Sequence, residues 1–537
     1  MDIIEAARLL RRREVSSTEL VRDAFARADA VDQVTGAYLH RMTEPALRAA
    51  RRADADLAAG RDRGPLHGIP LAVKDNMFTA DGPTTAQSRV HDPSWDDAPD
   101  ATVVARLRAH GAVITGKLTL SEFAIGQQSP DSPFPRPRNP WNPRCWPGGS
   151  SSGTGVAVAA GMVFAGLGTD TAGSIRIPSA MCGITGLKPT FGRVPVTGAI
   201  PLAPSLDHVG PMARSARDCA LLLQAIAGHD PSDPASSTAP VPDCGAGGPR
   251  LPRPFRVGVA MPFTSGLDPA AAAFDDALAV LGSLGARLTD VTLPDYEPAT
   301  AAAKIILEAE SFAYHKTTLR TRWRDYAPMT RQRLATGAFT SVADLDRARR
   351  QREQTIASLG ELLRTVHVIV SPAMPIPAPA LDRHGSPDRA VIFTAARPMR
   401  YWSLSGYPAL VVPMGFSPAG LPVSLQIVGS PFEEPTVLAV GVAFQAATDW
   451  HRAEPALNIT HTSDGAAGTG VLDGAAGTGA LPAGPPPASA AAAAAAEALT
   501  RHGITGVEDD IAALAAAYTA HLGDVETLRQ GAASRQR

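Results

Sequence analysis

The sequence predicts an α/β fold, a sheet covered by helices, with a helical appendage at the C-terminus. Upstream of residue 458, apolar runs of strand length alternate with stretches of helical periodicity, as expected for helices packed on a sheet. Beyond that point the composition changes: DGAAGTG occurs at 464–470 and again at 473–479, before a Pro-rich stretch. We therefore expect a Gly/Ala/Pro-rich linker over 458–489 and a helical appendage over 490–537.

The first part of the chain contains signals for both helices and strands. Residues 2–58 are predicted to be helical, and Ser16 with Glu19 forms a capping box at the start of one helix. Short apolar runs at 69–73 and 112–115 predict buried strands. A short helix lies between them in this prediction.

The second half continues the alternation after a Pro- and Gly-rich connection at 229–254. An Ala-rich helix is expected at 269–285, and residues 301–365 are helical and charged. The predicted strands are 254–260, 287–293, 366–375, 409–413 and 423–428.

Composition excludes several classes of function. The formal net charge is −2, so the sequence carries no nucleic-acid footprint. No run of about 18 apolar residues is present, and we expect no membrane span. The cysteines are widely spaced and form no CxxC pair, which favours reduced thiols in a cytoplasmic protein over a disulfide framework or a metal site. These cysteines are Cys145, Cys182, Cys219 and Cys244.

Two Gly/Ser clusters, 148–155 and 171–174, flank an apolar run at 156–167. They permit three interpretations: glycine turns around a buried helix, a phosphate cradle, or a serine hydrolase. The phosphate cradle lacks the P-loop lysine. Residues 149–153 match G-x-S-x-G, but a nucleophile elbow follows a strand, and the Pro-rich segment 139–149 is no central strand. That match is therefore not the expected nucleophile.

Lys74 follows the apolar run at 69–73 directly. The chain has only five lysines and otherwise carries its positive charge on arginine. A buried lysine can be neutral near pH 7, whereas arginine stays charged. Lys74 is thus a candidate base, and the alternative is an ion pair with the adjacent Asp75.

Taken together, these segments resemble the amidase signature family, and their combination is far more specific than any single glycine run. The resemblance covers roughly residues 1–457 and keeps the family's order. The matching segments are GIPLAVKDN (68–76), GAVITGKLTLSEFA (111–124), NPWNP and PGGSSSGTGVAVAAG (within 139–161), GTDTAGSIRIPSAMCGITGLKPTFGRV (168–194), SLDHVGPMARSARD (205–218), and GYPALVVPMGF and GLPVSLQIVG (within 406–429).

The resemblance implies a large mixed β-sheet core covered by helices, with 1–457 as one catalytic domain. It also implies a Ser-Ser-Lys triad: Ser174 as nucleophile, Ser150 as relay on a cis peptide bond, and Lys74 as base. The backbone N–H groups of the turn would form the oxyanion hole. The hole residues are Thr171, Ala172, Gly173 and Ser174, and the supporting residues are Ser151, Asp170 and Arg176.

Other polar residues near the motifs have structural interpretations. Lys117 and Glu122 are expected to form an ion pair near the site. His208 is interpreted as a structural histidine. By the resemblance, the helical region 301–365 varies in the family and shapes the acyl pocket. Its candidate residues, which the sequence does not rank, are Glu308, Glu310, Tyr314 and His315.

The main functional hypothesis is a cytoplasmic amidase that cleaves a carboxylic amide through a seryl acyl-enzyme. One alternative is the glutaminase component of a tRNA-dependent amidotransferase, and another is a catalytically silent scaffold or binding subunit. The expected partner is a small-molecule amide, with no nucleic acid, membrane, metal or cofactor. A homo-oligomer stays open.

Overall fold

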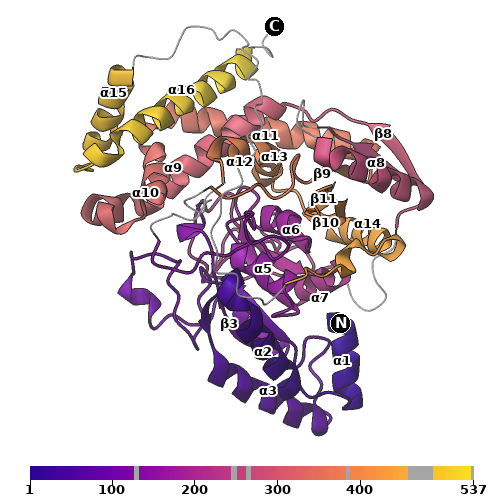
Figure 1. Cartoon of the computed structure of the whole chain (residues 1–537). Helices are drawn as coiled ribbons and strands as arrows, with labels where there is room; N and C mark the ends of the chain where they lie inside the picture. Colours follow the sequence, from indigo (N-terminus) through magenta and orange to yellow (C-terminus); the bar gives the residue numbers. More distant parts are fainter. Residues whose placement is uncertain (126–131, 244–250, 262–267, 383–386, 458–487, 534–537) are drawn as a thin grey trace.

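A single mixed sheet runs through the middle of the molecule (Figure 1). The computed structural model describes residues 1–125, 132–243, 251–261, 268–382, 387–457 and 488–533. Within them the sheet has eleven strands, in the order β1-β3-β2-β4-β6-β5-β10-β11-β9-β7-β8. The strands are β1 Tyr38–Arg41, β2 Pro70–Lys74, β3 Val113–Leu118, β4 Ala165–Asp170, β5 Thr185–Lys188, β6 His208–Ala213, β7 Phe255–Val259, β8 Ala286–Asp290, β9 Val368–Pro372, β10 Ala409–Phe416 and β11 Pro422–Gly429.

Parallel and antiparallel pairs alternate across this sheet. β2 runs parallel to both β3 and β4, and β7 runs parallel to β8 and β9. The pairs between β4 and β9 are antiparallel, as is the edge pair of β1 and β3. Most central strands are buried along their whole length, which explains their continuous apolar runs. The α/β prediction and the mixed sheet are confirmed.

Helices cover the sheet, with the N-terminal and C-terminal helices at opposite ends of the molecule (Figure 1). The helices are α1 Ile3–Arg12, α2 Ser17–Thr35, α3 Thr43–Ala58, α4 Thr102–Ala109, α5 Ser152–Ala159, α6 Arg176–Cys182, α7 Ala216–Ile226, α8 Asp268–Ser283, α9 Tyr296–Arg322, α10 Pro328–Ala335, α11 Val342–Thr365, α12 Arg389–Ala395, α13 Arg397–Ser405, α14 Glu434–Ala447, α15 Ala488–Arg501 and α16 Ile511–Ala533.

Local signals placed most of these elements correctly. The capping box of Ser16 and Glu19 is present at the start of α2. The first segment also contains a strand, β1, because its four residues form the edge of the sheet against β3 and no local periodicity announces it. The apolar run at 156–167 is divided: α5 ends at Ala159 and β4 begins at Ala165. The interpretation as one buried helix was wrong because both elements are buried and their apolar residues merge.

The C-terminal helices pack on the body of the protein. α15 and α16 contact each other, and α16 also contacts α9, α10 and α11, as Figure 1 shows at the upper edge of the molecule. α15 begins at Ala488, two residues before the end of the expected linker. The rest of that linker, 458–487, lies outside the described residues.

Candidate active site

Lys74 ends the buried strand β2 and lies against two hydroxyl groups. Its Nζ donates to Ser150 Oγ at 2.8 Å and to Thr169 Oγ1 at 2.7 Å, and the side chain is fully buried. Among the described residues no carboxylate is paired with Lys74. The predicted alternative, an ion pair with Asp75, is wrong, since successive residues at the end of a strand point to opposite faces of the sheet.

The environment of Lys74 favours an uncharged amine. Burial lowers the pKa of Lys74 to about 7, and the charges of Asp170 and Asp207 offset this shift only in part. The amine is therefore about half neutral near pH 7. In that form its lone pair can accept a proton from Ser150, while an N–H still donates to Thr169.

Ser150 lies in the tight loop that opens α5. The Gly149–Ser150 peptide bond is cis, as the family resemblance implies, and Ser150 is fully buried. Gly148 has φ +85°, and a Cβ there would lie 2.5 Å from Pro178 Cα, so only glycine fits this turn. The next residue, Ser151, exchanges hydrogen bonds with Thr169 through its hydroxyl. Ser151 thus anchors the loop to β4.

Ser174 lies in the turn between β4 and α6. Its backbone carbonyl accepts a hydrogen bond from Ser151 N–H at 3.1 Å, so the two serine loops are joined directly. Ser174 keeps 9% of its surface exposed and lines a cavity, whereas Ser150 is sealed behind it. Among the hydrogen bonds of the described residues none joins the hydroxyls of Ser150 and Ser174. A proton passing between them requires Ser174 to rotate about its side-chain bond.

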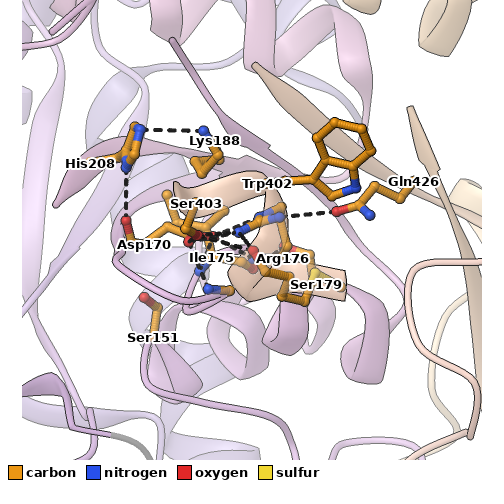
Figure 2. Close-up of polar contacts among 12 residues, drawn as sticks. Ser151, Asp170, Ile175, Arg176, Ser179, Lys188, His208, Trp402, Ser403 and Gln426 are labelled. Carbon is orange, nitrogen blue, oxygen red and sulfur yellow. Dashed lines mark hydrogen bonds and ion pairs between the residues drawn. The ribbon is translucent and has the colours of Figure 1, made fainter. Parts of the chain in front are cut away.

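The turn that carries Ser174 is held by a buried ion pair (Figure 2). Asp170 accepts hydrogen bonds from Arg176 Nε at 2.9 Å and from another guanidinium nitrogen at 3.0 Å. Arg176 also donates to Ser403 Oγ and Gln426 Oε1. Burial alone would raise the pKa of Asp170, but the charge and hydrogen bonds of Arg176 outweigh it and hold that pKa well below its usual range.

This ion pair corrects one member of the predicted oxyanion hole. Gly173 N–H donates to Asp170 Oδ1 at 2.7 Å, so this donor is already occupied. In the described part of the chain the N–H groups of Thr171, Ala172 and Ser174 donate to no other group. These groups remain the candidate donors. Thr171 is itself fixed, because its hydroxyl donates to Asp207 at 2.5 Å.

A cavity of about 420 Å³ opens in front of Ser174. Cavities of this size typically hold a drug-sized ligand. Its apolar wall near the serine comes from Ala124, Ile125, Trp146, Ile177 and Leu202. The outer part is lined by α9, α12 and α13, by Arg333 and Thr336, and by α16. The cavity therefore joins the candidate nucleophile to the C-terminal helix.

Two further predictions concerned polar residues near the motifs. The Lys117–Glu122 ion pair was wrong: Lys117 pairs with Asp75 at 2.9 Å, and Glu122 accepts from Ser88 and from Ala327 N–H. Both lysine and carboxylate thus have closer partners. His208 agrees with its structural interpretation, since its ring contacts Lys188 Nζ at 3.3 Å and the carbonyl of Leu206 (Figure 2 shows the lysine contact).

Of the four candidates in the helical region, only Glu308 lines the cavity. Burial would raise the pKa of Glu308, but the charge of Lys304 at 3.1 Å outweighs it and lowers that pKa to about 2. Glu310 instead accepts from Ser205, and Tyr314 is 44% exposed. His315 is buried beside Tyr326. Glu308 is therefore an ionised cavity residue rather than a proton donor.

Sequence reasoning missed two contributions to this site. Thr169 contacts both Lys74 and Asn76, and it stands within the quoted GTDTAGS segment. A hydroxyl next to the candidate aspartate was the available signal. The residues of α16 had none, because their proximity to Ser174 arises only from tertiary packing.

Two searches of the described residues gave negative results. No helix among them has the length and apolar character needed to cross a membrane. No group of three or more His, Cys, Asp or Glu residues among them could hold a metal ion.

The mixed sheet and a buried lysine between hydroxyls, next to a cavity-facing serine, are typical of a hydrolase with an α/β fold. Comparison with known proteins makes this specific: the sequence model of the Amidase family matches residues 19–438. The chain belongs to this family, the amidase signature family, and is a hydrolase that acts on amide bonds.

Individual relatives agree with the assignment. The chain is 40% identical to the putative amidase AmiD of Mycobacterium tuberculosis, over 85% of this chain and 96% of that protein. It is also 40% identical to the first subunit of the glutamyl-tRNA(Gln) amidotransferase of Roseiflexus sp., over 86% and 99%. A solved protein complex, described as revealing the evolutionary origins of an s-triazine catabolic enzyme, contains a similar chain. That chain has a TM-score of 0.76 and 33% identity, over 83% of this chain and 98% of the other.

Proposed function

We propose that the protein hydrolyses a small-molecule carboxylic amide through an acyl-enzyme on Ser174, with Lys74 as base and Ser150 as proton relay. The observation that carries the proposal is the 2.8 Å contact between Lys74 Nζ and Ser150 Oγ in a site without a paired carboxylate. A serine hydroxyl is a weak nucleophile until a base takes its proton, and neutral Lys74 can supply that base.

The reaction would start when Lys74 takes a proton from Ser150 and Ser150 takes one from Ser174. Ser174 Oγ then attacks the amide carbonyl carbon and forms a tetrahedral oxyanion. The N–H groups of Thr171, Ala172 and Ser174 are the candidate donors to that oxyanion, and one such donor is typically worth about 3–4 kcal/mol in kcat. The relayed proton returns to the leaving nitrogen as the C–N bond breaks. Water then attacks the acyl-enzyme and releases the acid.

Asp170 and Arg176 would act through the turn rather than on the substrate. Their ion pair holds Gly173 and Ile175 by backbone hydrogen bonds, and these residues flank Ser174. Ser151 would hold the Ser150 loop in the same way. The apolar wall near Ser174 favours an apolar acyl group. A cytoplasmic location is part of the proposal, and it is supported by the buried, unpaired Cys145, Cys182 and Cys219.

A serine-directed fluorophosphonate probe tests the nucleophile. Intact-mass spectrometry is expected to show one adduct on the wild-type protein and none on Ser174→Ala. Ser152→Ala is the control, because its hydroxyl only donates to Gly148 carbonyl. Labelling that persists in Ser174→Ala, or no labelling of a folded wild-type protein, would contradict the proposal.

The second candidate, the glutaminase component of a tRNA-dependent amidotransferase, is favoured by the Roseiflexus relative. The two functions share Ser174 but differ in substrate. We expect the purified chain alone to release ammonia or amine from apolar amides faster than from glutamine. Glutaminase activity that exceeds amidase activity across the panel would support the second candidate instead.

A further inference from the structure

The cavity in front of Ser174 has walls from two separate parts of the chain. Ser174, Thr171 and Ile177 belong to the segment matched by the Amidase family, which ends at residue 438. Ala517, Ala520 and Asp524 line the same cavity and belong to α16, beyond that match. The relatives described above are covered almost completely, while about a seventh of this chain is left over. The wall from α16 is therefore a feature of this chain beyond the family match.

Charged groups fix α16 at this position. Lys304 of α9 pairs with Asp524 at 2.5 Å and with Glu308 at 3.1 Å. His521 of α16 lies 3.4 Å from Glu308 and is almost completely buried. At the start of the helix, Asp510 pairs with Arg331 at 2.8 Å. Several independent contacts thus define which face of α16 points toward the cavity.

Apolar packing supports the same placement. Val525 and Leu528 are buried in a cluster with residues of α9, α11 and α13, and Leu514 is buried in a second cluster near Trp323. These side chains recur on one stripe of the helix, as expected for a helix that packs on a body. α16 therefore forms a fixed wall and not a loosely attached end.

The residues that α16 presents to the cavity are small. Ala517 and Ala520 follow each other at a spacing of three, so they lie on the same face of the helix. Each ends at Cβ and leaves room in the part of the cavity away from the nucleophile. Phe393 and Leu307 line the same outer part from the body of the protein. A larger side chain at either alanine would shorten the space while leaving Ser174 untouched.

We propose that α16 sets the acyl-chain length that the enzyme accepts, with Ala517 and Ala520 as the specificity-determining residues. The substrates are amides with an extended apolar acyl group, whose far end lies against these alanines. This inference rests on the proposed function, because it assumes that the acyl group occupies the cavity next to Ser174.

A series of p-nitroanilides with one leaving group and increasing acyl length, from acetyl to octanoyl, tests the proposal on the full-length chain. Ala517→Leu and Ala520→Leu are each expected to lower kcat/KM for the octanoyl substrate by about tenfold or more, mainly through KM. Activity on the acetyl substrate should stay within about twofold of wild type, because Ser174 and its surroundings are unchanged.

Ala516→Leu is the matched control, since Ala516 is an exposed neighbour on the same helix that does not line the cavity. It should leave both substrates unaffected, and thermal unfolding should confirm that all variants are folded. Equal losses on acetyl and octanoyl substrates, or no loss on either, would overturn the assignment to α16. An inactive wild-type protein across the whole series would instead contradict the proposed function.

Discussion

Lys74 and Lys117 lie on neighbouring parallel strands and are both fully buried, but their surroundings differ in one respect. Lys117 has a carboxylate partner, Asp75, at 2.9 Å. Lys74 has only the hydroxyls of Ser150 and Thr169. In the strand register Val73 is opposite Lys117, so Lys117 shares a face of the sheet with Val73 and not with Lys74. Asp75 continues that alternation and reaches Lys117.

The comparison shows how one sheet can hold a structural cation and a candidate base side by side. Burial lowers the pKa of both lysines, and in Lys117 the charge and hydrogen bond of Asp75 act against that shift. Lys74 lacks such a contact partner, and burial brings its pKa to about 7. The presence or absence of one carboxylate therefore separates an ion pair from a titratable amine.

The largest expected effect comes from removing the candidate base. Lys74→Met should lower kcat/KM by about a thousandfold, because general-base catalysis typically contributes 10²- to 10⁴-fold. Lys117→Met should keep activity within about tenfold of wild type per folded molecule. Steady-state kinetics on one anilide substrate, normalised to folded protein by circular dichroism, measures both. Similar activity losses in the two variants would remove the distinction between the lysines.

The next effect concerns stability and falls on the other lysine. Lys117→Met leaves the buried carboxylate of Asp75 without its cation, and breaking a buried pair in this way typically costs about 3–5 kcal/mol. Denaturant unfolding should show a loss of that size in Lys117→Met. The double variant Lys117→Met/Asp75→Leu should recover part of the loss, because no charge is left unpaired. A double variant less stable than Lys117→Met would contradict the ion-pair argument.

The strand arrangement also explains what the sequence could and could not predict. Motif residues such as Lys74, Ser150 and Ser174 were recognisable because each lies in a compact segment whose residue types are specific. The partner of Lys117 was not recognisable, since choosing Asp75 over Glu122 requires the register of β2 against β3. The wall from α16 was invisible for the same reason: Ala517 and Ser174 are far apart in sequence, and only packing brings them to one cavity.

The pH dependence of the reaction sharpens the comparison further. If Lys74 must be neutral, activity is lost as the amine is protonated, so kcat/KM should rise about tenfold per pH unit below pH 7 and level off above it. Lys117→Met should show the same inflection, because Lys117 takes no part in the proton transfer. A profile that is flat from pH 5 to 9 in wild type, with chemistry limiting the rate, would contradict the role of Lys74.

The smallest expected effect tests the hydroxyls that replace a carboxylate at Lys74. Thr169→Val keeps the shape of the side chain but removes the oxygen that accepts from Lys74 at 2.7 Å. Loss of one such hydrogen bond typically corresponds to about 0.5–1.5 kcal/mol, and we expect about a fivefold lower kcat/KM at pH 8. The protonated amine loses more from this change than the neutral amine, because a charged donor forms the stronger hydrogen bond. The pKa of Lys74 should therefore fall further, and the inflection in kcat/KM should move below that of wild type. Thr169→Ser retains the oxygen and should restore the wild-type inflection, whereas an inflection that moves upward in Thr169→Val would show that Thr169 does not stabilise the charged form.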